Sequence, residues 1–224
     1  MVKPRVPEGG AIVDDEEISA EEYSATMKKV LKNEYLQIVR KIIQDIRPPE
    51  NGTVVEIGPG PGWIGIWLAR ARPDLHVIGI EPSGDMRRVA GTNAESEGVA
   101  GNVQYVDGFV ENMGMIPDQS ADLVISNGSL HHWSDPQQGL QEILRVLKPT
   151  GKIYVQDNRR DYGFGGKIIV HVLGPLIAGK MRKYWISSLK ASYTPEEVSQ
   201  FVGQINAPNW VVKSDVIELS IESR

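Results

Sequence analysis

The sequence predicts an α/β domain with a mostly parallel sheet, and two features of the chain carry that prediction. First, apolar runs of strand length alternate with helical segments. Such alternation is typical of parallel strands joined by right-handed helical crossovers. Second, apolar runs at 210–212 and 216–221 predict a closing hairpin, and hence an antiparallel edge. The predicted parallel strands fall at residues 54–57, 76–81, 103–106, 122–126 and 152–156.

Helix signals separate these strands. Ser19 followed by Glu22 forms a capping box that predicts the start of one long helix, which ends at Pro48-Pro49. A turn at residues 149–151 is expected before the fifth strand. Shorter helices are predicted from Trp63, over about residues 84–97, from Ser134 and Pro136, and after the cap at Thr194.

The bulk composition fits one soluble domain. The chain has 224 residues, of which 41% are hydrophobic and 24% charged. Residues 1–18, rich in breakers and acids, are expected to form a flexible arm before a single domain at 19–224. No apolar run approaches the ~18 residues of a membrane helix, so we expect a cytoplasmic protein without a transmembrane segment. The net charge of −5 argues against nucleic-acid binding.

A glycine-rich turn follows the first strand. Gly58, Gly60 and Gly62 precede a helix start, and such a turn leaves backbone amides open to a ligand. The overlapping pattern G-x-G-x-x-G would also suit a dinucleotide. Pro59 and Pro61, however, remove amide donors that a pyrophosphate would need.

Acidic residues end the first strands and indicate what the ligand is. Glu81, after the second strand, is placed to accept hydrogen bonds from ribose hydroxyls. Asp107, after the third strand, could take an adenine amine. Glu56 beside the glycine turn would favour a ligand that carries an ammonium group. Together these residues predict a site for an adenosine that bears an amino acid.

These motifs resemble those of class I S-adenosylmethionine-dependent methyltransferases. The match runs through residues 54–62, 80–82, 106–108, 116–124 and 142–152, and so covers roughly half the chain in the correct order. The resemblance implies a Rossmann-like three-layer sandwich with helices on both faces. Its seven-stranded sheet would have the order 3-2-1-4-5-7-6, with strand 7 antiparallel.

The resemblance also implies the roles of individual residues. The three glycines would pass beside the methionine and ribose of S-adenosyl-L-methionine, with Glu56 near the ammonium and Glu81 on the ribose. The residues implied in cofactor binding are Glu56, Gly58, Gly60, Gly62, Glu81, Pro82, Met86, Asp107, Gly108 and Asn127.

The acceptor is expected to be a small molecule. The chain lacks the Asn-Pro-Pro-aromatic motif of amide and nucleobase enzymes and has no cysteine, whereas residues 130–133 resemble the small-molecule branch. His131 or His132 could act as a base, because a histidine titrates near neutral pH. We expect no metal site, because adjacent histidines do not chelate on one face.

Residues 159–190 form a basic and apolar insertion, with seven basic residues against one acid. Its apolar stretch at 168–178 could be a lid over the acceptor, an interfacial or dimer-forming helix, or a core crossover. An anionic, aromatic or apolar acceptor would suit the lid. The candidate substrate-binding residues are Trp133, Arg159, Arg160, Tyr162, Tyr184 and Trp185.

Two alternatives to methyl transfer stay open at this point. A regulatory protein could bind S-adenosylmethionine without turnover, and a nicotinamide-dependent oxidoreductase would use the same glycine pattern. The chain could act as a monomer or a homodimer.

Overall fold

A seven-stranded sheet forms the centre of the computed structural model, which describes residues 4–7, 18–163, 165–166, 170 and 182–224. The strand order is β3-β2-β1-β4-β5-β7-β6, as predicted. Strands β1 to β5 pair in parallel, and β7 pairs antiparallel with both β5 and β6. The strands are β1 (Thr53–Ile57), β2 (His76–Ile80), β3 (Val103–Val106), β4 (Ala121–Asn127), β5 (Leu147–Asn158), β6 (Trp210–Ser214) and β7 (Glu218–Ser223).

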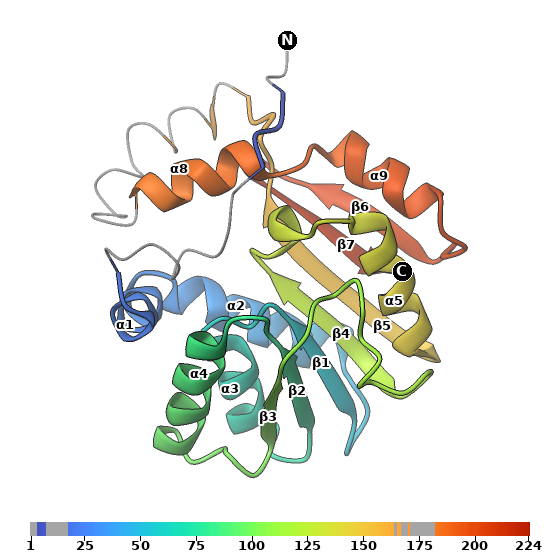
Figure 1. Ribbon diagram of the computed structural model, residues 1–224. Coiled ribbons are helices and arrows are strands. Elements are labelled where there is room, and N and C mark those ends of the chain that lie inside the picture. The colour runs from blue at the N-terminus through green and yellow to red at the C-terminus, as the bar shows by residue number, and fades with distance from the viewer. Residues whose placement is uncertain (1–3, 8–17, 164, 167–169, 171–181) are drawn as a thin grey trace.

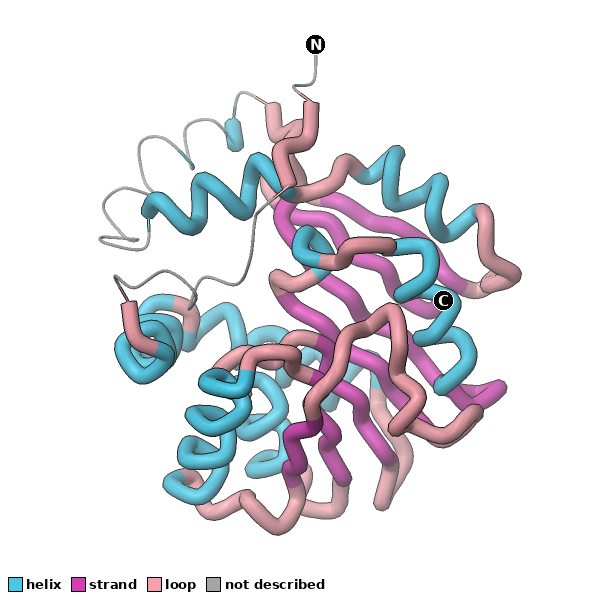
Figure 2. Tube along the Cα trace, viewed as in Figure 1, coloured by secondary structure: helices cyan, strands magenta, loops and turns pink. Residues whose placement is uncertain are grey.

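Helices cover both faces of the sheet, as Figures 1 and 2 show. Successive residues of β1 alternate between the two faces. Val54 packs with side chains of α2 and α3, whereas Val55 packs with those of α5 and α9. The helices are α1 (Ala20–Val30), α2 (Lys32–Lys41), the π-helix η2 (Ile42–Ile46), α3 (Trp63–Ala71), α4 (Gly84–Ser96), the 3-10 turn η3 (Leu130–His132), α5 (Pro136–Val146), α8 (Arg182–Ala191) and α9 (Pro195–Gly203).

The predicted single helix before Pro48 is divided in the structure. Ser19 caps α1 as expected by accepting a hydrogen bond from the Glu22 amide, but Leu31 has φ −100° and ψ 8° and ends that helix. The Leu31 side chain packs near Met27. Because of the break, α1 can lie against α4 while α2 packs against the sheet.

The fifth strand is longer than predicted. Residues 149–151, expected to form a turn, lie within β5, because Ala121 pairs with Leu147 and Leu123 pairs with Lys152. The extra residues make a bulge instead of ending the strand. A Cβ at Gly151 would lie 2.9 Å from the Ala121 carbonyl oxygen, so glycine permits this close approach.

The N-terminal arm is a third difference. Residues 4–7 contact the body of the domain, whereas the sequence predicts a flexible arm over residues 1–18. Residues 8–17 lie outside the described residues, and so do 167–169 and 171–181 of the insertion; its role as a lid, interface or crossover stays open. In the described parts of the chain, no helix has the length and apolar character needed to span a bilayer.

Candidate functional site

The glycine turn joins β1 to α3 at the centre of the sheet. Gly58, Gly60 and Gly62 have φ values of +60°, +51° and +81°. The Gly58 amide donates to the Ile80 carbonyl at 2.9 Å, which ties the turn to the end of β2. The sheet order reverses on either side of β1, whose neighbours are β2 and β4. A crevice at such a reversal is where open α/β sheets bind ligands.

The three glycines serve different purposes. A Cβ at Gly58 would lie 2.6 Å from the Ser129 Cβ, and one at Gly62 would collide with the Tyr105 hydroxyl. These two positions therefore need glycine for packing as well as for positive φ. A Cβ at Gly60 would meet nothing within 4 Å. The backbone at Gly60 thus faces open space in which a ligand can lie.

Glu81 faces this open backbone from just beyond the end of β2. Its carboxylate accepts hydrogen bonds from the amides of Gly60 and Ser83, each at 3.0 Å. Only 7% of the residue is exposed. Burial raises the pKa of the Glu81 carboxyl, and the two amides act in the opposite direction. One of these amides belongs to the glycine turn and the other to the start of α4, so the side chain bridges the two segments.

Glu56 is more deeply buried, with 3% of its surface exposed. Burial raises the pKa of its carboxyl to about 8, although the nearby Gly65 amide acts to lower it. Among the residues that the structure describes, Glu56 Oε2 and the Tyr105 hydroxyl are buried without a hydrogen-bond partner. A buried acceptor of this kind favours a cationic ligand group nearby.

The predicted adenine side lies at the ends of β2 and β3. Asp107 is exposed and pairs with Arg87 at 2.7 Å, and Pro82 is exposed as well. Met86 is buried and packs with Ala20 of α1. A Cβ at Gly108 would lie 2.7 Å from the Met115 Cε. Asp107 and Pro82 are thus accessible to a ligand, whereas Met86 also serves the helix packing.

Asn127, at the end of β4, interacts with a residue of α2. Its side chain lies near Glu34 of α2, a half-buried acid whose pKa burial raises and Asn127 lowers. The next residue, Gly128, has φ +65° and exposed backbone. The break between α1 and α2 thus allows an acidic side chain to reach the end of β4.

His131 forms a buried pair with Asp157 at the end of β5. Its Nδ1 lies 2.9 Å from both Asp157 oxygens, and its backbone amide donates to Oδ2 at 2.8 Å. Each residue is 3% exposed. His132 is exposed, with its ring centroid 4.1 Å from that of His131. The two histidines differ in setting: His131 is fixed by a carboxylate, and His132 faces solvent.

Trp133 lies in the core below this loop. It is 5% exposed, and its indole nitrogen donates to Ser129 Oγ at 3.1 Å. A Cβ at Gly139 of α5 would lie 3.1 Å from the indole ring. This placement favours a packing role over the substrate contact predicted from the sequence.

The two arginines expected to bind an acceptor both have acidic partners. Arg159 pairs with Asp161 at 2.7 Å, and Arg160 forms a two-pronged pair with Glu197 of α9. These two arginines are therefore neutralised by acidic partners, one of which, Glu197, lies outside the basic insertion.

Three aromatic residues were also predicted to contact the acceptor. Tyr184 of α8 is buried beside Met27, Trp185 is half-buried, and burial raises the pKa of the half-buried Tyr162. Tyr184 thus packs α8 on α1.

Three residues of the site were not among the predicted ones. Asp157 stands at a strand end, a position that the fold class marks, but its pairing with His131 spans 26 residues. Glu34 and Arg5 carry no sequence signal, because each reaches the site from a distant segment. Arg5 donates to the carbonyl of His131 at 2.7 Å.

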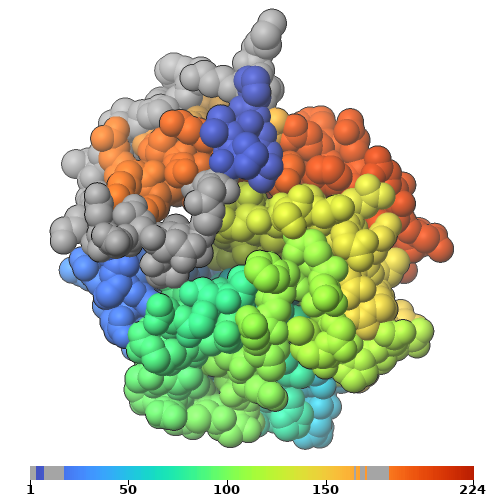
Figure 3. Space-filling view, viewed as in Figure 1, coloured from blue at the N-terminus to red at the C-terminus, as the bar shows by residue number. Residues whose placement is uncertain are grey.

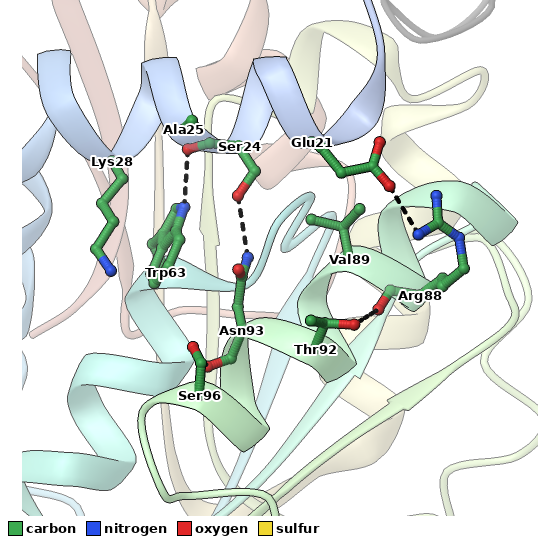
Figure 4. A pocket seen from close by; sticks show the side chains of 10 residues that line it. All are labelled: Glu21, Ser24, Ala25, Lys28, Trp63, Arg88, Val89, Thr92, Asn93 and Ser96. Carbon is green, nitrogen blue, oxygen red and sulfur yellow. Dashed lines mark hydrogen bonds and ion pairs between the residues drawn. The ribbon is translucent and has the colours of Figure 1, made fainter.

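A pocket of about 310 Å³ lies away from the strand ends, between α1 and α4 (Figure 4). Asn93 donates to both Ser24 Oγ and the Pro61 carbonyl, at 3.0 and 2.9 Å. The Trp63 indole donates to the Ser24 carbonyl at 3.1 Å. These bonds join α1 to the glycine turn. The pocket is lined by Glu21, Ser24, Ala25, Lys28, Trp63, Arg88, Val89, Thr92, Asn93 and Ser96.

The histidines and acids of the described residues form no metal site. Across residues 4–7, 18–163 and 182–224 and the isolated positions between them, no three such side chains gather closely enough to hold an ion.

Comparison with known proteins points to one family. Residues 55–155 match the methyltransferase domain family. An uncharacterized methyltransferase of Bacillus subtilis, YdaC, is 29% identical over 49% of this chain, which spans 58% of that protein. The ubiquinone/menaquinone biosynthesis C-methyltransferase UbiE of Geotalea daltonii is 25% identical over 74% of this chain and 70% of its own length.

Solved structures agree with this match. A candidate S-adenosyl-L-methionine-dependent methyltransferase from Methanococcus maripaludis superimposes with a TM-score of 0.68 and 25% identity, covering 97% of this chain and 96% of that one. The sheet order, the glycine turn and these matches agree. The chain has the fold and the sequence motifs of the class I S-adenosylmethionine-dependent methyltransferases, the family whose methyl donor is S-adenosyl-L-methionine.

Proposed function

We propose that this protein transfers a methyl group from S-adenosyl-L-methionine to a small-molecule acceptor. One observation carries the proposal: the buried Glu81 carboxylate is held against the backbone of Gly60, where space is open. A carboxylate in that place can exchange its amide partners for two ribose hydroxyls. The accessible Asp107 would then take the adenine amine.

Glu56 would pair with the amino group of the cofactor's methionine part. With a pKa of about 8, its carboxyl is largely protonated at neutral pH in the free protein. An ammonium group nearby would favour the carboxylate, and the carboxyl would release its proton. This response to a cation distinguishes the site from a pyrophosphate site, which Pro59 and Pro61 also disfavour.

The bound cofactor supplies a methyl group on a sulfonium, already activated for in-line displacement. The chain mainly has to align the acceptor and keep water away from the reacting atoms. His131 and Asp157 support this role because they are buried at the ends of the neighbouring strands. His132, on the solvent side, is the weaker candidate.

His131 would accept the proton when the acceptor must lose one. Asp157 accepts a hydrogen bond from Nδ1, which fixes the tautomer that carries its lone pair on Nε2. That tautomer is the one that can take up a proton at Nε2. Asp157 would then stabilise the charged imidazolium that results.

The acid partners of Arg159 and Arg160 argue against an anionic acceptor. Apolar or aromatic acceptors stay compatible with the half-buried rings of Trp185 and Tyr162. We therefore propose an uncharged acceptor with an apolar body.

The test is a transfer assay with cofactor labelled on the methyl group and fractionated small-molecule extract. We expect label in a small product when wild-type protein is present, and none with Glu81→Ala. The exposed, solvent-facing Glu95→Gln serves as the matched control and should behave as wild type. Tight cofactor binding without labelled product in any fraction would favour a regulatory protein instead. Preference for a nicotinamide dinucleotide would overturn the proposal.

A further inference from the structure

Residues 4–7 lie on the surface where η3, the end of α8 and the start of α9 meet. Figure 3 shows this short segment, in dark blue, against the orange of α8 and the yellow-green of the region around η3. The Val6 amide donates to the Lys190 carbonyl at 3.0 Å. The segment therefore binds the domain through its backbone as well as through a side chain.

The Arg5 side chain makes three further contacts. Its Nε donates to the Ala191 carbonyl at 2.5 Å, and its Nη2 donates to the His131 carbonyl at 2.7 Å. Its guanidinium carbon lies 4.3 Å from the centre of the Tyr193 ring. One side chain thus joins segments that lie 126 and 186 residues away along the chain.

The contact with His131 matters because of what already holds that residue. The Asp157 carboxylate accepts a hydrogen bond from the backbone amide of His131 and lies beside its ring nitrogen Nδ1. Arg5 donates to the backbone carbonyl of His131. Asp157 and Arg5 together fix the ring and both polar groups of the backbone. Within the loop, η3 is a three-residue turn that follows Gly128 at φ +65°, and the Trp133 indole donates to Ser129 at its start.

A lysine could not make the same set of contacts. The guanidinium is a planar fork that donates through two nitrogens to two carbonyls and stacks its face on an aromatic ring. An ammonium group at the same place would keep the charge but not this geometry. If the segment merely needed a positive charge, Arg5→Lys would be harmless.

We propose that Arg5 is a positioning residue for the methyl transfer proposed above: its guanidinium sets the His131 carbonyl and thereby the His131–Asp157 pair. The inference rests on the proposed function for its catalytic meaning, but the link between Arg5 and His131 can be measured without any acceptor. Arg5 itself does not touch the reacting atoms; it acts through His131.

The first experiment is a pH titration of the histidine rings by nuclear magnetic resonance in wild type, Arg5→Lys, Arg5→Ala and Val6→Ala. The chain has four histidines, and His131→Gln identifies the signal of His131. We expect both Arg5 variants to shift the resonances and the titration midpoint of His131. Val6→Ala keeps the backbone bond to Lys190 and should leave both unchanged. Unchanged His131 signals in a folded Arg5 variant would overturn the inference.

The second experiment measures S-adenosylhomocysteine binding and, with the acceptor found in the labelling assay, single-turnover transfer. We expect the transfer rate to fall by about 10-fold to 100-fold in Arg5→Lys, the scale expected for a misplaced catalytic group, with cofactor affinity within twofold of wild type. An equal loss of cofactor affinity would contradict a positioning role. Absence of cofactor binding in wild type would refute the proposed function, whereas the His131 titration would still decide the link to Arg5.

Discussion

The two sides of the proposed site, the cofactor side and the acceptor side, are built in different ways. The cofactor side comes from residues 56–108, where consecutive strands and turns place Gly60 against Glu81. The acceptor side joins Arg5, His131 and Asp157 with the junction of α8 and α9. The first is a local structure that short motifs specify, and the second is assembled from distant segments. Substitutions on the two sides should therefore separate cofactor binding from transfer.

The largest expected effect on transfer comes from Asp157→Asn. The amide would no longer fix the His131 tautomer or stabilise its charged form, so we expect the transfer rate to fall by about 10² to 10⁴. Cofactor affinity should stay within twofold of wild type. Asp135→Asn, an exposed helix cap that asparagine can replace, is the matched control. A comparable rate loss in the control would contradict the assignment of Asp157 as the residue that fixes the His131 tautomer.

Gly58→Ala should lower the free energy of unfolding, because the new methyl group would clash on the cofactor side. Both Gly58 and Gly60 have positive φ, which costs an alanine roughly 1–2 kcal/mol, but only at position 58 would the new methyl group meet Ser129. Urea unfolding should therefore show a larger loss for Gly58→Ala than for Gly60→Ala. Equal losses would mean that Ser129 moves aside without cost.

Glu56→Gln should change how stability depends on pH. The carboxyl has a pKa of about 8 in the folded protein against 4.5 as the reference value. A raised pKa means that wild-type stability is fully present below pH 4.5 and falls as the pH rises towards 8. The glutamine variant should lack this fall, which at its limit is about 1.4 kcal/mol for each pH unit in that window. Unfolding curves at pH 5, 7 and 9 measure the difference.

Cofactor binding should also change the protonation of the Glu56 carboxyl. Calorimetry at pH 7 in buffers of different ionisation enthalpy should show proton release on binding to wild type and less release in Glu56→Gln. The same proton count in both proteins would show that the cofactor's ammonium does not act on Glu56.

Much of the cofactor side could be predicted from the sequence because its signals are local. The glycine spacing, the acids at strand ends and the alternation of strands and helices indicate the sheet order, which the structure confirms. The break at Leu31 could not be predicted, because the apolar periodicity continues through it and the packing of α1 on α4 decides it.

The acceptor side was harder to predict because its contacts join segments that are distant in the sequence. Charge counting along residues 159–190 suggested a positive surface, but Glu197 of α9, which pairs with Arg160, lies outside that window. Trp133 belongs to a motif and yet packs in the core. Arg5 lies in a segment whose composition indicates a free tail. Only long-range contacts determine these placements.

The smallest effect on function is expected from Arg160→Ala. Loss of its pair with the half-buried Glu197 should cost about 1–3 kcal/mol of stability, the usual range for a broken bond to a charged group. Cofactor affinity should not change, and acceptor KM should stay near the wild-type value if the acceptor is uncharged. Thermal unfolding and steady-state kinetics measure the two effects. A large rise in KM would instead restore Arg160 as an acceptor-binding residue.

The most direct test of the two-sided site is calorimetric titration of S-adenosylhomocysteine into wild type, Glu81→Ala and Asp157→Asn. The difference between the sides predicts that Glu81→Ala weakens binding by about 100-fold or more, the scale of a lost hydrogen-bonded carboxylate, and that Asp157→Asn binds as wild type does. Equal affinity in all three folded proteins, or a loss confined to Asp157→Asn, would contradict the assignment of Glu81 to the cofactor side.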